Sequence, residues 1–289
     1  MKIYKDVLLK EYTTFKIGGR SSYFADCSSL NNLKKALKFA NDKKIEFFVL
    51  GKGSNIIFSD EGFNGLVVFN NINFLKINQT ELHVGAGFDF MKLGLITAEL
   101  DLGGLEFAAG VPGSLGGAVF MNASAFAQQV SDFMTEVEYL TENGEKLILK
   151  KEDCKFSYRN SFFQETKGVI VSAKFKLIKN KNAKEKQNEL VSIKRKNQPM
   201  NEKNAGCIFK NPINHKAKDL ISECGLKNFQ FGGAKISDLH ANFIINESDA
   251  TAKDVLDLIE HIKKIVFEKK NIELEQEVKV IYSKVRNEF

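Results

Sequence analysis

The chain has 289 residues, enough for one large domain or for two to three smaller ones with a substantial apolar core. Charged residues interrupt the first 15 positions, and the longest apolar stretch contains five glycines and a proline, so neither a signal peptide nor a membrane span is expected. The net charge of +6 comes mainly from lysines interleaved with acidic residues, which is typical of a solvated surface and not of a nucleic-acid site.

The first elements that the pattern predicts are a helix, a strand and a glycine loop. Ser28 and Ser29 can cap a helix whose apolar residues recur at helical spacing, namely Leu30, Leu33, Leu37 and Ala40. The strand Ile45–Leu50 leads into the loop Gly51–Asn55, and a second short strand, Ile56–Phe58, follows. Rossmann and P-loop phosphate sites open a helix, so this loop matches neither of them.

Turn and periodicity signals predict the middle of the chain. We expect hairpins over residues 73–87 and 136–149, a helix over 90–102 and a strand over 168–178. Gly103 and Gly104 would end the helix, and Asn143-Gly144 is the turn of the second hairpin.

A glycine-rich stretch from Gly104 to Ala125 is the most informative part of the sequence. Its glycines surround Pro112 at positions 104, 110, 113, 116 and 117. Glycine lets backbone N–H groups approach a ligand closely, and phosphates bind well to such groups. Together with the Gly51–Asn55 loop, this stretch favours a large nucleotide cofactor. The alternative for either loop alone is a tight turn packed against strands.

A polar stretch over residues 179–188 predicts a domain boundary. Beyond it we expect a helix that ends at Gly225, a strand over 242–246, a helix over 251–269 and a closing strand over 277–285. An apolar stripe on the longer helix is typical of core packing. Helices and strands mix without a regular βαβ repeat, which indicates an α+β fold in two or three parts.

The cysteines and histidines form no recognisable metal site. Cys27, Cys154, Cys207 and Cys224 lie far apart without a Cys-x-x-Cys pair, and the four histidines are equally scattered. This spacing also argues against a disulfide scaffold, so we expect a cytoplasmic protein without a bound metal.

Seven motifs make the chain resemble the UDP-N-acetylenolpyruvoylglucosamine reductase family over nearly its whole length. They lie, in the family's order, at Thr13–Gly19, Leu50–Asn55, Gly104–Ala123, Tyr158–Ser161, Asn204–Pro212, His240–Phe243 and Leu274–Val278. Each motif alone is weak, but seven in order are specific. The chain resembles the shorter branch of the family, which lacks a tyrosine-bearing insertion between Arg159 and Cys207.

The resemblance implies an FAD-binding fold of the vanillyl-alcohol-oxidase type in two subdomains, followed by an α+β substrate domain. We place these parts at residues 1–70, 71–180 and 181–289. The family uses non-covalent FAD, takes NADPH as co-substrate and reduces an enolpyruvyl UDP-sugar for peptidoglycan synthesis. The flavin would contact Gly51, Gly53, Ser54, Asn55, Gly110, Pro112, Gly113, Ser114, Gly117 and Asn122. We expect a monomer with a small-molecule substrate and no nucleic-acid partner.

Two catalytic residues follow from the resemblance. Arg159 matches the family's catalytic arginine, whose planar guanidinium suits the substrate carboxylate as negative charge develops on it. Glu277 matches the catalytic glutamate. From the residues alone, Arg159 is better interpreted as a surface ion-pair residue and Glu277 as a solvent-facing strand residue. Glu275 would point to the same side of a regular strand, so only the motif separates it from Glu277.

Cys207 is the departure from the family, which usually has a serine proton donor at this position. An unperturbed thiol has a pKa near 8.5 and is a much stronger acid than an alcohol, so cysteine is competent to protonate the substrate. The residues on either side keep the motif's register. The alternative is an ordinary buried cysteine.

The resemblance assigns substrate contacts to Tyr158, Lys210 and Asn211. A basic segment containing Arg195, Lys196 and Gln198 is a candidate for the substrate diphosphate, without individual assignments. Two other functions stay open at this point: another FAD-dependent oxidoreductase of the same fold, or a flavin- or nucleotide-binding module without catalysis.

Overall fold

The computed structural model describes residues 1–282, and the fold over that range is α+β, as the sequence predicts. The chain forms two compact units. Unit 1 comprises Met1–Tyr4, Phe24–Lys52 and Gly65–Lys194. Unit 2 comprises Lys5–Tyr23, Gly53–Asn64 and the chain from Arg195 onward. The division into three functional domains stays a prediction.

Three strands cross from one unit to the other along the chain: β1 (Ile3–Leu8), β2 (Arg20–Cys27) and β5 (Phe63–Asn70). They form a four-stranded sheet of order β1-β2-β5-β3 with β3 (Phe47–Leu50). Helix α1 (Leu30–Lys43) precedes β3, and the Ser29 hydroxyl accepts a hydrogen bond from the Asn32 amide at 3.2 Å. The predicted cap and helix are therefore confirmed.

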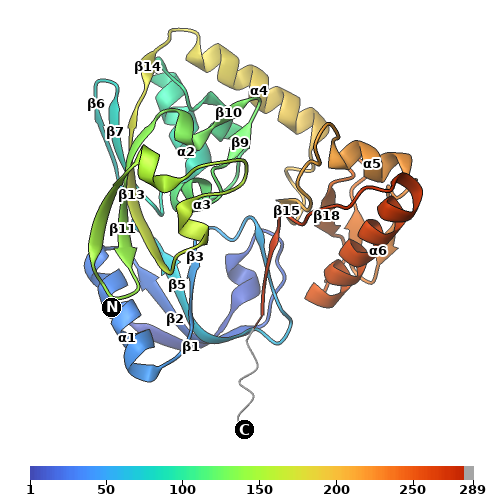
Figure 1. Cartoon of the computed structure of the whole chain (residues 1–289), viewed down its shortest axis with the longest axis horizontal. Helices are drawn as coiled ribbons and strands as arrows, with labels where there is room; N and C mark the ends of the chain where they lie inside the picture. The colour runs from blue at the N-terminus through green and yellow to red at the C-terminus, as the bar shows by residue number, and fades with distance from the viewer. Residues whose placement is uncertain (283–289) are drawn as a thin grey trace. The chain divides into compact units, whose positions relative to one another are not determined.

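A five-stranded antiparallel sheet of order β12-β11-β13-β7-β6 is the framework of unit 1 (Figure 1). Its strands are β6 (Leu75–Asn78), β7 (Glu81–Gly85), β11 (Met134–Thr141), β12 (Lys146–Lys150) and β13 (Gly168–Lys176). Both predicted hairpins are present, and Gly144 at the turn of the second has a φ of 85°. Leu82, Phe90, Leu115 and Phe175 are among the buried residues of this unit's core.

Short elements complete unit 1. The helices are α2 (Phe90–Glu99), α3 (Leu115–Phe120) and α4 (Ala183–Asn197), whose last three residues belong to unit 2. The short strands are β8 (Leu102–Gly103), β9 (Ser124–Ala125), β10 (Gln128–Gln129) and β14 (Ile178–Lys179). Single 3-10 turns are η2 (Glu106–Gly110), η3 (Val130–Asp132), η4 (Lys151–Cys154) and η5 (Phe162–Gln164).

The sequence placed the end of α2 incorrectly. The helix ends at Glu99, Asp101 has a φ of 55°, and Gly103 pairs with Ile178 in a two-stranded sheet. Gly103 is therefore a strand residue and not a helix cap, because a β pairing with residues 75 positions later competes for its backbone. The same pairing separates the predicted strand 168–178 into β13 and β14.

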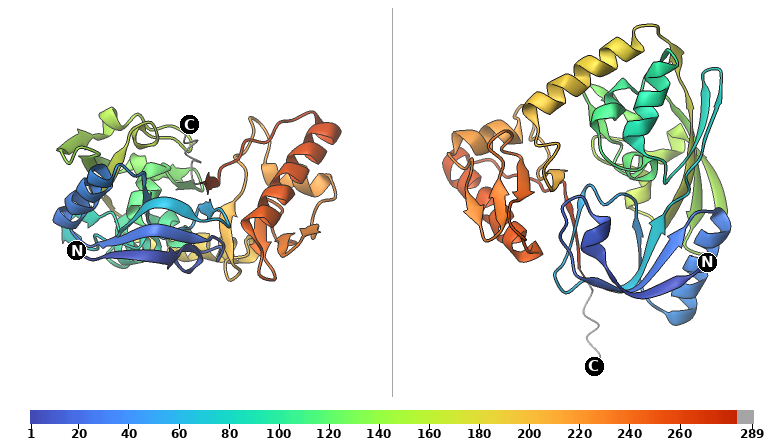
Figure 2. Two further views of the ribbon diagram at one scale, coloured as in Figure 1. Left: turned by 90° about the horizontal axis from the view of Figure 1, so that it is seen from below. Right: turned by 180° about the vertical axis from the view of Figure 1, so that it is seen from behind.

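Unit 2 packs a helix against a four-stranded sheet of order β15-β18-β17-β16, as Figure 2 shows. The strands are β15 (Asn204–Cys207), β16 (Gln230–Phe231), β17 (Ala234–Ile236) and β18 (Phe243–Asn246). The other elements are η1 (Leu9–Tyr12), β4 (Ile56–Phe58), α5 (Ala217–Glu223), α6 (Ala252–Lys270) and β19 (Lys279–Ile281). Strand β19 is shorter than predicted and pairs in parallel with β4; residues 283–285 of the prediction lie outside the described residues.

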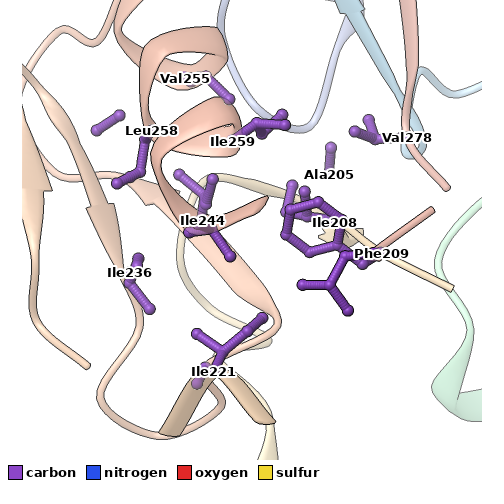
Figure 3. Close-up of a cluster of buried hydrophobic side chains, with 14 of the residues drawn as sticks. Ala205, Ile208, Phe209, Ile221, Ile236, Ile244, Val255, Leu258, Ile259 and Val278 are labelled. Carbon is purple, nitrogen blue, oxygen red and sulfur yellow. The ribbon is translucent and has the colours of Figure 1, made fainter. Parts of the chain in front are cut away.

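The core of unit 2 fills the space between α6 and its sheet (Figure 3). Val255, Leu258 and Ile259 on α6 are fully buried, as are Ile208 and Ile244 on the sheet side. Thr251 and Asp254 form a reciprocal capping box that begins α6 at the predicted position. Within residues 1–282, no helix is both long and apolar enough to cross a membrane.

Candidate functional site

The two glycine loops predicted from the sequence meet within unit 1. A side chain at Gly51 would collide with the Ser114 hydroxyl, so the loops approach each other as closely as glycine allows. Two backbone hydrogen bonds fix the second loop, from the Phe90 amide to the Gly113 carbonyl at 3.0 Å and from the Leu115 amide to the Phe88 carbonyl at 2.9 Å. Gly51 and Ser114, more than sixty positions apart in the chain, therefore lie in contact.

An ion pair between Lys52 and Asp89 lies beside these loops. Asp89 also caps α2 by accepting a hydrogen bond from the Lys92 amide at 2.8 Å. Burial alone would raise the pKa of Asp89, but the hydrogen bonds from Lys52 and the Lys92 amide outweigh burial and lower it. The sequence does not predict this pair, because nothing in the local pattern links a loop lysine to a helix cap 37 residues later.

The remaining residues of the second loop differ in their environments. Pro112 and Gly117 are exposed, whereas the Gly110 carbonyl accepts a hydrogen bond from the Lys194 ammonium at 2.8 Å. Asn122 is 1% exposed. Its side-chain nitrogen donates to Gln129 and to the Ser157 carbonyl, and its side-chain oxygen accepts from the Ser131 amide. In this structure Asn122 therefore ties neighbouring loops together, and its predicted flavin contact stays a prediction.

The rest of the first loop belongs to unit 2. Gly53 has a φ of 64°, and a Cβ there would collide with the Tyr12 carbonyl, so the position requires glycine. The Asn55 carbonyl accepts a hydrogen bond from the Lys279 amide at 3.1 Å, and its side-chain amide lies 3.5 Å from the Glu277 carbonyl. The loop and the segment that carries Glu277 are therefore in contact.

Arg159 lies in a tight turn of unit 1. The amide of Asn160 bonds to the carbonyl of Ser157 at 3.2 Å, and the reverse bond from Ser157 to Asn160 has the same length. Arg159 has a φ of 56°, a region that side-chain-bearing residues rarely adopt and that costs on the order of 1 kcal/mol. Its guanidinium donates to the Ser124 hydroxyl at 2.6 Å and lies 5.0 Å from the centre of the Tyr158 ring.

Cys207 and Glu277 lie on two segments that run side by side in unit 2. The Glu277 amide donates to the Ile208 carbonyl at 2.8 Å, and the Lys210 amide donates to the Glu275 carbonyl at the same distance. These bonds bracket the antiparallel bridge between Phe209 and Gln276. The Glu277 backbone is therefore aligned with Ile208, the residue after Cys207.

Charged residues surround this pair. Lys210 forms an ion pair with Glu275 at 2.6 Å, and Glu275 is 71% exposed, which separates it from the partly buried Glu277. Burial, and then the positive charge of Lys210, lower the pKa of Lys279. Lys279 is not among the residues predicted from the sequence, although a lysine two residues after Glu277 would extend from the same side of an extended segment.

The predicted substrate residues have distinct contacts. Tyr158 is 50% exposed beside Arg159. Asn211 accepts a hydrogen bond from the Ala217 amide at 3.0 Å, which positions the start of α5. Arg195, Lys196 and Gln198 lie at the end of α4 and just beyond it, and their diphosphate contact stays a prediction.

The cysteines differ in accessibility. Cys207 is partly exposed, whereas Cys27, Cys154 and Cys224 are buried. Burial raises the pKa of Cys27 and of Cys154 to about 12. Among the described residues, no group of three or more His, Cys, Asp or Glu side chains could hold a metal ion.

Comparisons with known proteins agree with the motifs. A model of the C-terminal domain of UDP-N-acetylenolpyruvoylglucosamine reductase matches residues 198–281, and an FAD-binding-domain model matches residues 21–150. The chain is 46% identical over 95% of its length to that reductase from Protochlamydia amoebophila, covering 92% of the relative. It is 39% identical over 94% of its length to the reductase from Halalkalibacterium halodurans, covering 92% of it.

A solved structure gives the same result. The crystal structure of the reductase from Thermus caldophilus is similar to this chain with a TM-score of 0.84 and 32% identity. The similarity covers 98% of this chain and 100% of that one.

Proposed function

The chain belongs to the UDP-N-acetylenolpyruvoylglucosamine reductase family, and from that premise we propose that Arg159, Cys207 and Glu277 carry its chemistry. The protein is an FAD-containing oxidoreductase that uses NADPH to reduce UDP-N-acetylglucosamine enolpyruvate to UDP-N-acetylmuramate. This reaction supplies a precursor for peptidoglycan synthesis. The observation that supports the assignment of Cys207 and Glu277 is the pairing of their two segments in unit 2, where the Glu277 amide bonds to the carbonyl of Ile208, the residue after a partly exposed Cys207. The assignment of Arg159 rests on its motif.

The residue types around the glycine loops suit FAD. Backbone N–H groups, the Ser114 hydroxyl and the Asn55 amide are hydrogen-bond donors of the kind that bind a diphosphate. We assign the flavin contacts to the residues predicted from the sequence, namely Gly51, Gly53, Ser54, Asn55, Gly110, Pro112, Gly113, Ser114, Gly117 and Asn122. FAD held by these residues would supply hydride transfer from NADPH to one carbon of the enolpyruvyl double bond.

The chain's own residues then have two tasks. Arg159 binds the substrate carboxylate, where negative charge builds up as the double bond is reduced; a preorganised donor of this kind contributes on the order of 3 kcal/mol to transition-state stabilisation. Cys207 gives its thiol proton to the other alkene carbon, and Glu277, on the neighbouring segment, orients the substrate. Tyr158, Lys210 and Asn211 hold the remainder of the substrate.

A spectroscopic titration tests the activity. The purified protein should show flavin absorption that NADPH bleaches and that the enolpyruvyl sugar nucleotide restores, and acid precipitation should release the flavin into the supernatant. Bleaching without recovery by this substrate would indicate another flavin oxidoreductase, and no NADPH reaction at all would indicate a binding module. Flavin in the acid pellet would contradict non-covalent attachment.

Size-exclusion chromatography tests the predicted monomer, and cell fractionation tests the predicted cytoplasmic location.

A further inference from the structure

We propose that Asn242 is a positioning residue that holds the segment carrying Cys207 in register with Glu277; this inference rests on the proposed function of those two residues. Asn242 lies in the turn before β18 and is 3% exposed. Its side-chain oxygen accepts a hydrogen bond from the Phe209 amide at 2.9 Å, and its side-chain nitrogen donates to the Phe209 carbonyl at 2.8 Å. Its own carbonyl accepts from the Ile208 amide at 2.9 Å.

The side-chain amide of Asn242 makes the two hydrogen bonds to Phe209 that the backbone of a neighbouring strand would otherwise make. The pairing of β15 with β18 ends where Cys207 lies opposite Phe243. There the backbone turns away, with the Phe243 amide bonded to the His240 carbonyl at 2.9 Å. Phe209 is 1% exposed, so its backbone polar groups need partners inside the protein, and the planar Asn242 amide supplies a donor and an acceptor at once.

The other edge of the same segment carries Glu277. The Ile208 carbonyl and the Lys210 amide bond to the chain at Glu277 and Glu275, each at 2.8 Å. The segment is therefore fixed between Asn242 on one side and the Glu277 chain on the other. Figure 3 shows Ile208 and Phe209 among the core side chains that anchor it. Because side chains alternate along an extended segment, a slip by one residue would exchange Cys207 with the fully buried Ile208.

Asn246 offers a matched control on the same strand. Its side chain is also buried, at 9% exposure, and also bonds in both directions to backbone, donating to the Phe15 carbonyl at 3.1 Å and accepting from the Ala250 amide at 2.9 Å. Neither Phe15 nor Ala250 lies in the Cys207 segment. Alanine at either position removes a buried two-way amide, but only Asn242→Ala releases Phe209.

The test compares the two alanine variants at a temperature where both are folded. Asn242→Ala should slow flavin reoxidation by the enolpyruvyl substrate by roughly 10–100-fold, because a misplacement of about 1 Å has effects of this size. Reduction of the flavin by NADPH should change less than about twofold, since that half-reaction needs no proton from Cys207. Asn246→Ala should leave both half-reactions within about twofold of wild type.

A second readout follows Cys207 directly. The rate of alkylation of Cys207 by iodoacetamide is measured over a range of pH. This pH profile should differ from that of wild type in Asn242→Ala and match it in Asn246→Ala. If Asn242→Ala does not fold, Asn242→Asp keeps the acceptor for the Phe209 amide, loses the donor, and should show a smaller effect of the same kind. Equal slowing by both alanine variants, or wild-type reoxidation and alkylation in Asn242→Ala, would overturn the positioning role.

The alkylation profile also separates this inference from the proposed function. If Cys207→Ala reoxidises at the wild-type rate, Cys207 is not the proton donor and the proposed function of that residue fails. A shifted alkylation profile in Asn242→Ala would still support the positioning of the segment in that case.

Discussion

Arg159 and Cys207 are positioned by different kinds of structure, a tight turn and a strand segment. Arg159 lies in a turn closed by two backbone hydrogen bonds, with a strained φ of 56° and a side chain fixed by the Ser124 hydroxyl and the Tyr158 ring. Cys207 lies on a strand whose next residues are bonded along both edges and anchored by buried Ile208 and Phe209. At the turn, the side chain can be removed without disturbing a core. On the strand, the position of the Cys207 sulfur depends on the register of a whole segment.

Cys207→Ala should give the largest effect and tests the strand side of this comparison. Loss of a positioned general acid should slow flavin reoxidation by the substrate by roughly 10²–10⁴-fold and leave reduction by NADPH intact. Cys207→Ser should recover part of the loss, since serine is the family's usual residue, although the smaller oxygen would lie farther from the substrate. Stopped-flow absorbance measures both half-reactions.

Cys224→Ala is the control for that experiment, because Cys224 is a buried cysteine of the same unit. It should lower stability without slowing reoxidation. An unchanged reoxidation rate in Cys207→Ala would mean that another group or water supplies the proton.

Arg159→Gly tests the turn side. Glycine relieves the positive-φ strain, so the melting temperature should change little, while kcat should fall by about 10²–10³-fold through loss of the carboxylate donor. Arg159→Lys keeps the charge but not the planar fork and should recover only part of the activity. Steady-state NADPH oxidation and a thermal melt give the two readouts.

Lys155→Gly is the matched control, since Lys155 is exposed and has a φ of 45° in the same unit. It should be as stable as Arg159→Gly and fully active. Near-normal turnover in Arg159→Gly would remove Arg159 from the mechanism.

The two neighbouring glutamates sharpen the assignment on the strand. Glu277→Gln should lower kcat by roughly 10–100-fold without weakening FAD binding, because it removes the partly buried carboxylate that we assign to catalysis. Glu275→Gln breaks only the ion pair with Lys210. Because Glu275 is 71% exposed, this substitution should change kcat less than about twofold. The reverse ranking would show that the motif assigns the wrong carboxylate.

The smallest expected effect is on stability and concerns the turn before β18. Burial, and then the charge of Lys218, lower the pKa of His240 to about 4. Because the folded state resists protonation, the unfolded state binds more protons between about pH 6.5 and 4, and the free energy of unfolding falls as the pH drops through this window. The contribution is on the order of 1–3 kcal/mol, discounted for partial exposure.

Urea denaturation at pH 7 and pH 4.5 measures this effect. The loss of stability between the two pH values should be smaller in His240→Gln than in wild type. An equal loss in both proteins would show that His240 is not the group responsible.

Local signals predicted much of the fold. Ser29 caps α1, Asn143-Gly144 turns the hairpin of β11 and β12, and Thr251 begins α6, each at the expected position. These signals act over three or four residues, so a sequence carries them intact. The end of α2 was wrong because the pairing of β8 with β14 involves residues far apart in the chain.

The sequence by itself determined the family, the reaction, and the identity of the glycine loops and of Arg159, Cys207 and Glu277 as candidates, because their motifs are contiguous. Only the tertiary structure decided that Glu275 is exposed and paired with Lys210 while Glu277 is partly buried, that Lys52 pairs with Asp89, and that Asn242 supplies the hydrogen bonds of a neighbouring strand to Phe209. The physical reason is that a buried backbone group must find a partner, and the partner's identity depends on which distant segments fold against it.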